Sequence, residues 1–170
     1  MYMLIQKSSL WKVAEIFFIE PTKIHFIKEI SKKINLAPTS IRVHLQTLLE
    51  EGLIQKVESK PFDGYKAKRE NQDFIYEKKI ANLIILKSSN LIEKLKEKYP
   101  KSIILFGSFD KGEDIETSDI DIFIDAKSFK FNTELFEKNL NRKIHIIFRE
   151  QTEKSLVESI NQGTILFGER

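Results

Sequence analysis

Two aspartates near the middle of the chain have the residue type and spacing for metal chemistry. Asp119 and Asp121 stand at alternate positions of the apolar stretch SDIDIFID, where a β-strand would normally place buried side chains. Side chains two apart on a strand point to the same face, with Cα atoms about 6.5–7 Å apart, so the carboxylates would be neighbours. Because two like charges this close repel each other, a divalent cation such as Mg²⁺ or Mn²⁺ would stabilise the pair. The alternative is a solvated edge strand whose outer residues are polar.

A Gly-Ser pair lies upstream of these acids. Gly107 and Ser108 follow the apolar run SIILF, which predicts a short buried strand that ends at this pair. Glycine lets backbone N–H groups approach a phosphate closely, and the serine hydroxyl adds another donor. A Gly-Ser turn alone more often does no more than end a strand. Together with the two acids downstream, it favours a joint site for a metal ion and a phosphate.

The combined pattern resembles the nucleotidyltransferases of the DNA polymerase beta superfamily, especially their minimal type. The resemblance covers about residues 85–168. It rests on a Gly-Ser pair, a second glycine a few residues later, and Ser-Asp-x-Asp at the start of the next strand. These positions are Gly107, Ser108, Gly112, Ser118, Asp119 and Asp121, with Lys111 where such proteins often carry arginine.

The resemblance implies a fold, a substrate and a reaction. The fold would be a small mixed sheet with flanking helices, and Asp119 and Asp121 would hold the metal ion. A nucleotidyl group would pass from a nucleoside triphosphate to an acceptor, with release of pyrophosphate. The implied nucleotide-binding residues are Gly107, Ser108, Lys111, Gly112 and Ser118.

One position departs from the family's pattern. Active members usually carry a third carboxylate on a later strand, and the matching stretch NRKIHIIF has His145 there. Imidazole is a poor ligand for Mg²⁺, but a neutral histidine can act as a general base. Asp114, Asp125 and Glu150 are the candidates for a replacement acid. Two interpretations stay open: an enzyme whose catalytic residues are the two aspartates and His145, or a transcriptional regulator whose second domain is catalytically degenerate.

The N-terminal half predicts a different kind of domain. Its apolar spacing predicts a first helix in SLWKVAEIFFI, a second over 24–34, and a third that begins at Thr39 or Ser40. An extended segment follows and turns near Asp63 and Gly64. Two short helices joined by a tight turn, with such a hairpin behind them, resemble a winged helix-turn-helix domain. His25 and His44 have no cysteine or histidine partner at ligand spacing, and we expect both at or near the surface.

In the winged-helix family, the second helix of the pair enters the major groove of double-stranded DNA and the wing follows the phosphate backbone. Lysines on phosphates give affinity without sequence information, whereas Arg42 and Gln46 have the geometry to read bases. A lysine-rich face can equally be a solvated surface, and helix-turn-helix folds also serve as protein interaction modules. The predicted DNA-binding residues are Thr39, Ser40, Arg42 and Gln46 on the helix and Lys56, Lys60, Lys66, Lys68 and Arg69 on the wing.

Charge and length support a division of the chain. The net charge is +3, and it is distributed as +4 over residues 1–70, +2 over 71–99 and −3 over 100–170. A basic first part fits a nucleic-acid partner. We expect an α+β protein with a winged helix-turn-helix domain at 1–70, one linking helix or two abutting helices at 71–99, and a nucleotidyltransferase-like domain at 100–170.

Location and partners are expectations of the same kind. The chain has no cysteine, which excludes disulfides and thiolate metal sites. No stretch approaches the ~20 apolar residues of a membrane span, so we expect a cytoplasmic protein without membrane contact. After the strand KIHIIF only a helix and the tail GTILFGER remain, so a partner protein, a second subunit of a homodimer or a nucleic acid would supply the acceptor. Minimal nucleotidyltransferases often pair with a helical partner in toxin-antitoxin systems, and the resemblance extends that expectation to this chain.

Overall fold

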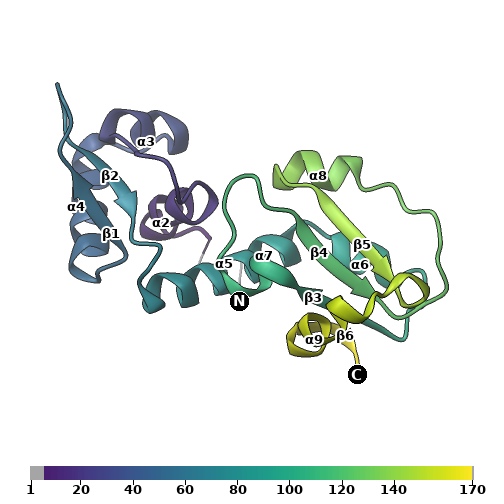
Figure 1. The fold of residues 1–170 in the computed structure, drawn as a ribbon. Helices are drawn as coiled ribbons and strands as arrows, with labels where there is room; N and C mark the ends of the chain where they lie inside the picture. Colours follow the sequence, from purple (N-terminus) through teal and green to yellow (C-terminus); the bar gives the residue numbers. More distant parts are fainter. Residues whose placement is uncertain (1–5, 170) are drawn as a thin grey trace. The chain divides into compact units, whose positions relative to one another are not determined.

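The computed structural model describes residues 6–169 (Figure 1). The chain divides into two compact units, Met1–Ala81 and Asn82–Arg170. Each unit buries apolar side chains of its own. Helices and a small mixed sheet are both present, which agrees with the expected α+β class.

Three helices open unit 1. They are α2 (Ser9–Ile19), α3 (Ile27–Ile34) and α4 (Pro38–Glu50). α3 is followed by Asn35, whose φ of 52° is the left-handed conformation that ends many helices. α4 begins at Pro38, slightly before the start predicted at Thr39 or Ser40. Proline is favoured at a first helical position because its ring fixes the right φ and no N–H is needed there.

A two-stranded hairpin follows the helices. β1 (Ile54–Val57) and β2 (Gly64–Ala67) pair in antiparallel fashion, and loop 58–63 joins them. Backbone hydrogen bonds also link His25 and Tyr65 in both directions, at N···O distances of 2.8 and 2.9 Å. The residue that precedes α3 by two positions is therefore paired with the hairpin.

His25 corrects an expectation from the sequence, because it is buried rather than at the surface, with 7% of its area exposed. Its ring packs edge-on against Phe17, with centroids 5.0 Å apart. Its Nε2 lies 3.0 Å from the carbonyl oxygen of Glu20. The backbone pairing with Tyr65 draws this residue inward, and a lone histidine in a sequence carries no sign of such pairing.

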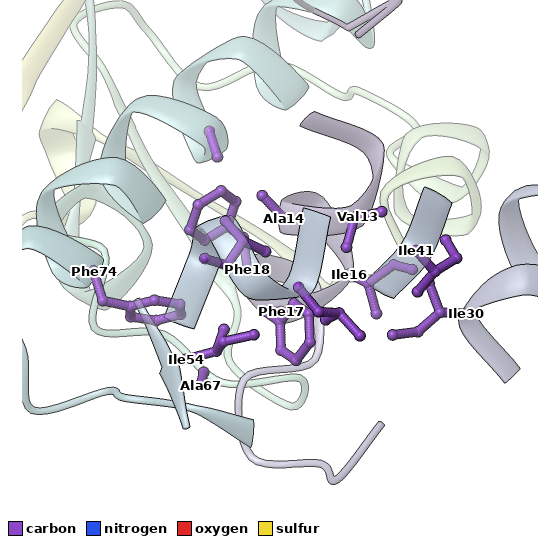
Figure 2. Packing of buried hydrophobic residues seen from close by; sticks show 13 residues of the cluster. Val13, Ala14, Ile16, Phe17, Phe18, Ile30, Ile41, Ile54, Ala67 and Phe74 are labelled. Atoms are coloured by element: carbon purple, nitrogen blue, oxygen red, sulfur yellow. The ribbon is translucent and has the colours of Figure 1, made fainter. Parts of the chain in front are cut away.

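The core of unit 1 gathers side chains from all of its elements. Phe17 and Ile41 are almost fully buried, and Figure 2 shows them among residues of the other helices and the hairpin. Phe74 adds a side chain from α5 (Gln72–Ser88). The buried members include Val13, Ile16, Phe17, Phe18, Ile30, Ile41, Leu45, Ile54, Ala67 and Phe74.

Glu20 ties the end of α2 to α3 by ion pairs to Lys23 and Lys33, at 2.6 and 2.5 Å. Burial alone would raise the pKa of Glu20, but the two lysines outweigh it and lower the pKa to about 2. The stabilisation of the folded state by the ionised Glu20 is complete above pH 4.5, the ordinary pKa of a glutamate, and is lost as the pH falls toward 2. Because both lysines are half exposed, we expect Glu20→Gln to cost only about 1 kcal/mol at pH 7.

Urea unfolding at pH 7 and pH 2.5 measures this cost. The difference between the native protein and Glu20→Gln should shrink strongly at the lower pH. A substitution with the same cost at both values would show that the carboxylate charge of Glu20 is not what stabilises this corner of unit 1.

Two helices occupy the segment predicted as a linker. α5 contributes its first turns to unit 1 and its last turns to unit 2. Within unit 1, the ammonium of the fully buried Lys78 donates a hydrogen bond to the Phe18 carbonyl at 2.7 Å. α6 (Leu91–Lys96) follows after Asn90, whose φ is 64°. The break at this residue separates two abutting helices, one of the two arrangements that the sequence left open.

Unit 2 is built on a four-stranded mixed sheet. Its strands are β3 (Ser102–Phe106), β4 (Ile120–Ile124), β5 (Ile144–Phe148) and β6 (Thr164–Gly168). They lie in the order β5-β4-β3-β6. β3 is antiparallel to β4 and β6, and β4 is parallel to β5. The remaining elements are α7 (Gly107–Lys111), α8 (Glu134–Leu140), α9 (Lys154–Gln162) and a short 3₁₀ helix, Arg149–Gln151.

Helices contribute side chains to the cores on both faces of this sheet. Ile103 and Leu105 of β3 share a buried cluster with Leu91 of α6. Ile104, on the opposite face, shares a smaller cluster with Ile160 of α9. β3 is therefore fully buried along its length, as expected for a strand that is apolar from Ile103 up to the Gly-Ser pair.

The C-terminal segment differs from the expected tail. It forms β6, which pairs with β3 in antiparallel fashion. Gly163 precedes it and lies so close to β3 that a Cβ there would meet the carbonyl oxygen of Leu105. A five-residue run after a helix gives too short a pattern to be distinguished from an irregular end.

No helix in residues 6–169 is long and apolar enough to cross a membrane.

Candidate functional site

The turn from β3 into α7 lies directly on the carboxylate of Asp121. Gly107 begins α7 with a φ of 79°, a conformation that favours glycine. A Cβ built at this position would lie 2.5 Å from Asp121 Oδ2, which is closer than side chains can approach. The structure therefore brings the Gly-Ser turn and the second aspartate together, and glycine is the residue that permits the approach.

β4 presents Asp121 between two neighbouring strands. It stands opposite Phe106 of β3 and His145 of β5, and its side chain is 25% exposed. The preceding Ile120 is fully buried on the other face. β4 begins at Ile120, so the exposed Asp119 ends the preceding loop instead of lying within the strand as predicted. Strand pairing begins there because the Ile120 N–H is the first to bond across, to a carbonyl 2.8 Å away.

Burial and the neighbouring charged groups shift the pKa of Asp121 in opposite directions. Burial raises the pKa of Asp121, the imidazole of His145 lowers it, and the negative charge of Asp119 raises it, with a net upward direction. Asp119 is therefore close enough to repel the second carboxylate. A bound cation would remove both the repulsion and part of the cost of burial.

We expect Asp121→Asn to stabilise the ligand-free protein at pH 7. A carboxyl whose folded pKa is raised binds more protons folded than unfolded, so stability falls as pH rises through the ordinary value of 3.8 and beyond. Asparagine removes that cost, and the melting temperature should rise by about 1–3 °C. Thermal unfolding at pH 7 and pH 3 checks this, since the gain should vanish at the lower pH.

The matched control for this substitution is Asp125→Asn. Asp125 directly follows β4, and its carboxylate pairs with Arg149 at 2.7 Å, so its neutralisation should not raise the melting temperature. A lower melting temperature for Asp121→Asn than for the native protein at pH 7 would show that the charge of Asp121 does not destabilise the folded protein.

His145 reaches the site from the solvent side. Its Nδ1 lies 3.6 Å from Asp121 Oδ1, and its side chain is 69% exposed. The parallel register of β4 and β5 places the two residues directly side by side. The imidazole is thus in a position to exchange a proton with a group bound at Asp121.

None of the three other acids lies beside the aspartate pair. Asp114 is buried, with 1% of its area exposed, and its carboxylate forms an ion pair with Arg142. Asp125 follows Asp121 by four residues along the chain, which is about 13 Å in an extended strand. Glu150 comes after the far end of β5, five residues beyond His145. Within residues 6–169, no third acidic side chain joins Asp119 and Asp121 in a group that could hold a metal ion.

A buried polar network supports the loop that ends at Asp119. Asn82 Nδ2 donates to the Phe109 carbonyl at 2.8 Å and to Asp114 Oδ1 at 2.7 Å. Arg142 Nη2 lies 3.4 Å from Asp114 Oδ2, and Arg142 Nη1 donates to the Glu116 carbonyl at 2.5 Å. α7, the loop and the start of β5 are held together by these bonds. Sequence reasoning missed this network because single polar residues in a helix or a loop carry no local signature.

The other residues of the predicted binding loop have clear local positions. Lys111 is exposed at the last position of α7, and Gly112 ends this helix with a φ of 76°. Ser118 Oγ accepts the Ile115 N–H at 2.9 Å, and the Ser118 N–H donates to the Ile115 carbonyl at 3.0 Å. Ser118 thus shapes the turn before Asp119, and nucleotide contacts from these residues stay a prediction.

The donor set fits a divalent cation only together with oxygens from a substrate. Within residues 6–169, no group of three or more His, Cys, Asp and Glu side chains is arranged to hold a metal ion. Asp119 and Asp121 supply two carboxylates, and Mg²⁺ is commonly bound by one or two carboxylates plus substrate phosphates and water. The Gly107 turn, pressed against one of these carboxylates, is where such a phosphate would lie.

An open cavity of about 470 Å³ borders the first aspartate. It lies between the loop segment 116–119, helix α8 and residues 141–143. Acidic and basic side chains both line it. The cavity thus leaves open space beside Asp119.

In unit 1, α4 exposes most of the side chains predicted to meet DNA. Thr39, Arg42 and Gln46 are exposed, and Ser40 is half-buried. Gln46 Nε2 donates to Glu50 Oε1 at 2.8 Å. The buried side of the helix carries the apolar residues predicted for it, Ile41, Leu45 and Leu48.

The predicted wing lysines occupy different parts of the hairpin. Lys60 is exposed in the loop 58–63, and Lys66 is half-buried on β2. Lys56 on β1 pairs with Asp63 at 2.6 Å, so part of its charge is neutralised within the hairpin. Lys68 and Arg69 follow β2 at the base of the hairpin and are half-buried.

Sequence reasoning missed two exposed apolar residues of this unit. Val43 on α4 is 64% exposed and Phe62 in the hairpin loop is 61% exposed. Val43 could have been found, because on the helical repeat it shares a face with the exposed Thr39 and Gln46. Phe62 lies next to Pro61 in an irregular loop, where periodicity predicts nothing.

The comparisons with known proteins concern unit 2. No curated protein and no solved structure matches the chain. Residues 88–167 match the family model described as the nucleotidyltransferase domain. This segment contains the Gly-Ser turn, both aspartates of the pair and His145. The expectation of a nucleotidyltransferase-like segment is therefore confirmed for residues 88–167, and this part of the chain is similar to the nucleotidyltransferase domain family.

Proposed function

We propose that unit 2 binds a nucleoside triphosphate with a divalent cation and transfers its nucleotidyl group to an acceptor hydroxyl. The observation that carries the proposal is the approach of Gly107 to Asp121, where a Cβ would lie 2.5 Å from the carboxylate. It places a turn suited to a phosphate beside a carboxylate pair suited to a cation. The family match over residues 88–167 supports the same chemistry.

The roles of the residues follow from their positions. Asp119 and Asp121 would hold Mg²⁺ or Mn²⁺, which neutralises charge on the phosphates. Backbone N–H groups at Gly107 and the Ser108 hydroxyl would orient the triphosphate. The acceptor oxygen attacks the α-phosphorus, the bond to the β-phosphate breaks, and pyrophosphate leaves with the bonding electrons. The exposed imidazole of His145 would take the proton of the acceptor hydroxyl.

The acceptor is proposed to come from outside unit 2. The open cavity beside Asp119 supplies the space, and a helical partner protein, the second subunit of a homodimer or a nucleic acid would supply the hydroxyl. A protein–protein pair of the toxin-antitoxin kind and an acceptor on protein or RNA both agree with the family resemblance.

Transfer of label from α-labelled nucleoside triphosphates tests this function. The purified chain with Mg²⁺ or Mn²⁺ should label itself, a copurifying protein or added RNA. Asp121→Asn should abolish the labelling. The matched control Asp125→Asn, whose native carboxylate pairs with Arg149, should retain it. No labelling by the native chain with either cation, under conditions where the nucleotide binds, would overturn transfer.

A second candidate function is nucleotide binding without transfer. It is favoured by one observation, the exposed His145 at the place of the third carboxylate. Unit 2 would then be a sensor domain of a DNA-binding regulator. Binding of ATP without transfer in the native protein, together with transfer in His145→Asp, would select this function.

Unit 1 is proposed to bind double-stranded DNA as a winged helix-turn-helix domain. Its order of elements supports the proposal, with α3 and α4 followed by the β1–β2 hairpin. The pairing of His25 with Tyr65 adds a short extended segment beside the hairpin. α4 would enter the major groove with Arg42 and Gln46 toward the bases, and the loop 58–63 would follow the backbone.

Duplex binding in increasing salt tests this role. We expect affinity to fall steeply with salt, and Arg42→Ala to weaken binding by about 5- to 150-fold if Arg42 makes a bidentate base contact. Lys12→Ala, which removes an exposed charge on α2, should change affinity much less. Equal losses for the two substitutions would contradict a specific role of α4.

A further inference from the structure

Unit 1 contains a mostly apolar surface cavity of about 550 Å³. It lies between the first turns of α3 and α4 and the hairpin loop 58–63. Its volume is within the range of sites that hold small ligands or parts of larger ones. The residues that decide its chemistry are Phe62, Lys28, Arg42 and Lys60.

The aromatic ring of Phe62 is presented to solvent at this cavity. The residue is 61% exposed, and the ammonium of Lys28 lies 5.2 Å from the ring centroid. A single exposed apolar residue is common on protein surfaces. Phe62 differs because its ring forms part of an apolar cavity wall and also has a cation above it. Proteins that bind single-stranded nucleic acid combine such rings, on which bases stack, with cations that contact the phosphates.

The charge that lines the cavity is mainly unneutralised positive charge. Within the described residues, Lys28, Arg42 and Lys60 form no ion pair. Of the two acids of the lining, one is neutralised by an ion pair and the other accepts a backbone N–H. Asp63 pairs with Lys56 at 2.6 Å, and Glu29 Oε2 accepts the Phe26 N–H at 3.4 Å. The cavity thus favours an anionic ligand with a flat apolar group.

We propose that this cavity takes an unpaired base of DNA, with Phe62 stacked on the base and Lys28 and Lys60 near the flanking phosphates. The inference rests on the proposed DNA binding of unit 1. A nucleobase fits because its ring has an apolar face and because phosphates lie on both sides of it. A base inside an intact duplex stays stacked on its neighbours, so the cavity distinguishes DNA with unpaired bases from a plain duplex.

Fluorescence anisotropy with the full chain tests the inference. Three labelled probes of the same sequence are needed: a duplex, the same duplex with a central unpaired bubble, and the single strand. The native chain should bind the bubble more tightly than the plain duplex. Phe62→Ala should weaken binding of the bubble by about 5- to 150-fold, the range for loss of base stacking on an aromatic ring, and weaken binding of the plain duplex much less.

Two further variants make the test specific. Phe62→Trp keeps a stacking ring and should retain the preference for the bubble. Tyr76→Ala removes an aromatic ring of similar exposure, 64%, from α5 and should change nothing. These results together would support a stacking site in the cavity.

The outcomes separate this inference from the function on which it rests. Equal affinity for all three probes, or an equal effect of Phe62→Ala on all of them, would overturn the base site while DNA binding stands. No binding to any probe at low salt would overturn DNA binding and the base site together.

Discussion

Replacing Gly107 with alanine should weaken binding of ATP with Mg²⁺ by at least about 100-fold, which corresponds to about 2.7 kcal/mol. The new Cβ would lie 2.5 Å from Asp121 Oδ2, and the φ of 79° is unfavourable for alanine. The turn must move away from the carboxylate or the carboxylate must rotate. Either change separates the proposed phosphate-binding turn from the proposed cation ligands, and isothermal titration calorimetry measures the loss.

Gly52→Ala is the matched control for the backbone effect. Gly52 has a similar φ of 70°, but its nearest neighbour for a Cβ is Asn71 Nδ2 at 3.3 Å in unit 1. The control should lose stability without losing nucleotide affinity. If Gly107→Ala, still folded by circular dichroism, bound ATP as tightly as the native chain, the contact between the turn and Asp121 would have no part in binding.

The largest effect on stability is expected for Asp114→Ala. The substitution leaves the guanidinium of Arg142, whose side chain is 5% exposed, buried without that carboxylate, and removes the acceptor for one bond of Asn82. Loss of one partner of a buried ion pair costs about 3–5 kcal/mol. Urea unfolding should show a loss of this size. The loop that carries Asp119 should loosen as well, which faster hydrogen exchange in residues 113–119 would report.

The ion pair of Asp125 and Arg149 gives the comparison, since the arginine side chain is 66% exposed. Asp125→Ala should cost no more than about 1 kcal/mol. Equal costs for the two substitutions would mean that burial of the Asp114 network adds nothing to the stability of unit 2.

The strands that carry the candidate site could be predicted from the sequence because their patterns are strong. IILF is an unbroken apolar run, and with Ser102 it forms the fully buried β3. In SDIDIFID, the isoleucines stand at every second position, and they are fully buried while Asp121 lies on the other face. Antiparallel neighbours bring the end of one strand to the start of the next, so Gly107 meets Asp121.

Other features depend on contacts distant in the sequence and were not predictable. Asn82 and Asp114 are 32 residues apart, and neither residue type indicates a buried partner. β6 pairs with a strand about 60 residues earlier in the chain, although its own pattern is too short to identify. Burial of His25 follows from its pairing with Tyr65, 40 residues later. In each case tertiary contact, not local propensity, fixes the structure.

The site of unit 2 is tested most directly by a calorimetric titration of the native chain with ATP in the presence of Mg²⁺, of Mn²⁺, and of a chelator. We predict binding with either cation, none with the chelator, and loss of binding in Asp121→Asn. The variant His145→Asp should bind at least as tightly as the native chain. Absence of binding by the native chain with both cations, with binding only in His145→Asp, would contradict a working nucleotide site formed by Gly107, Asp119 and Asp121.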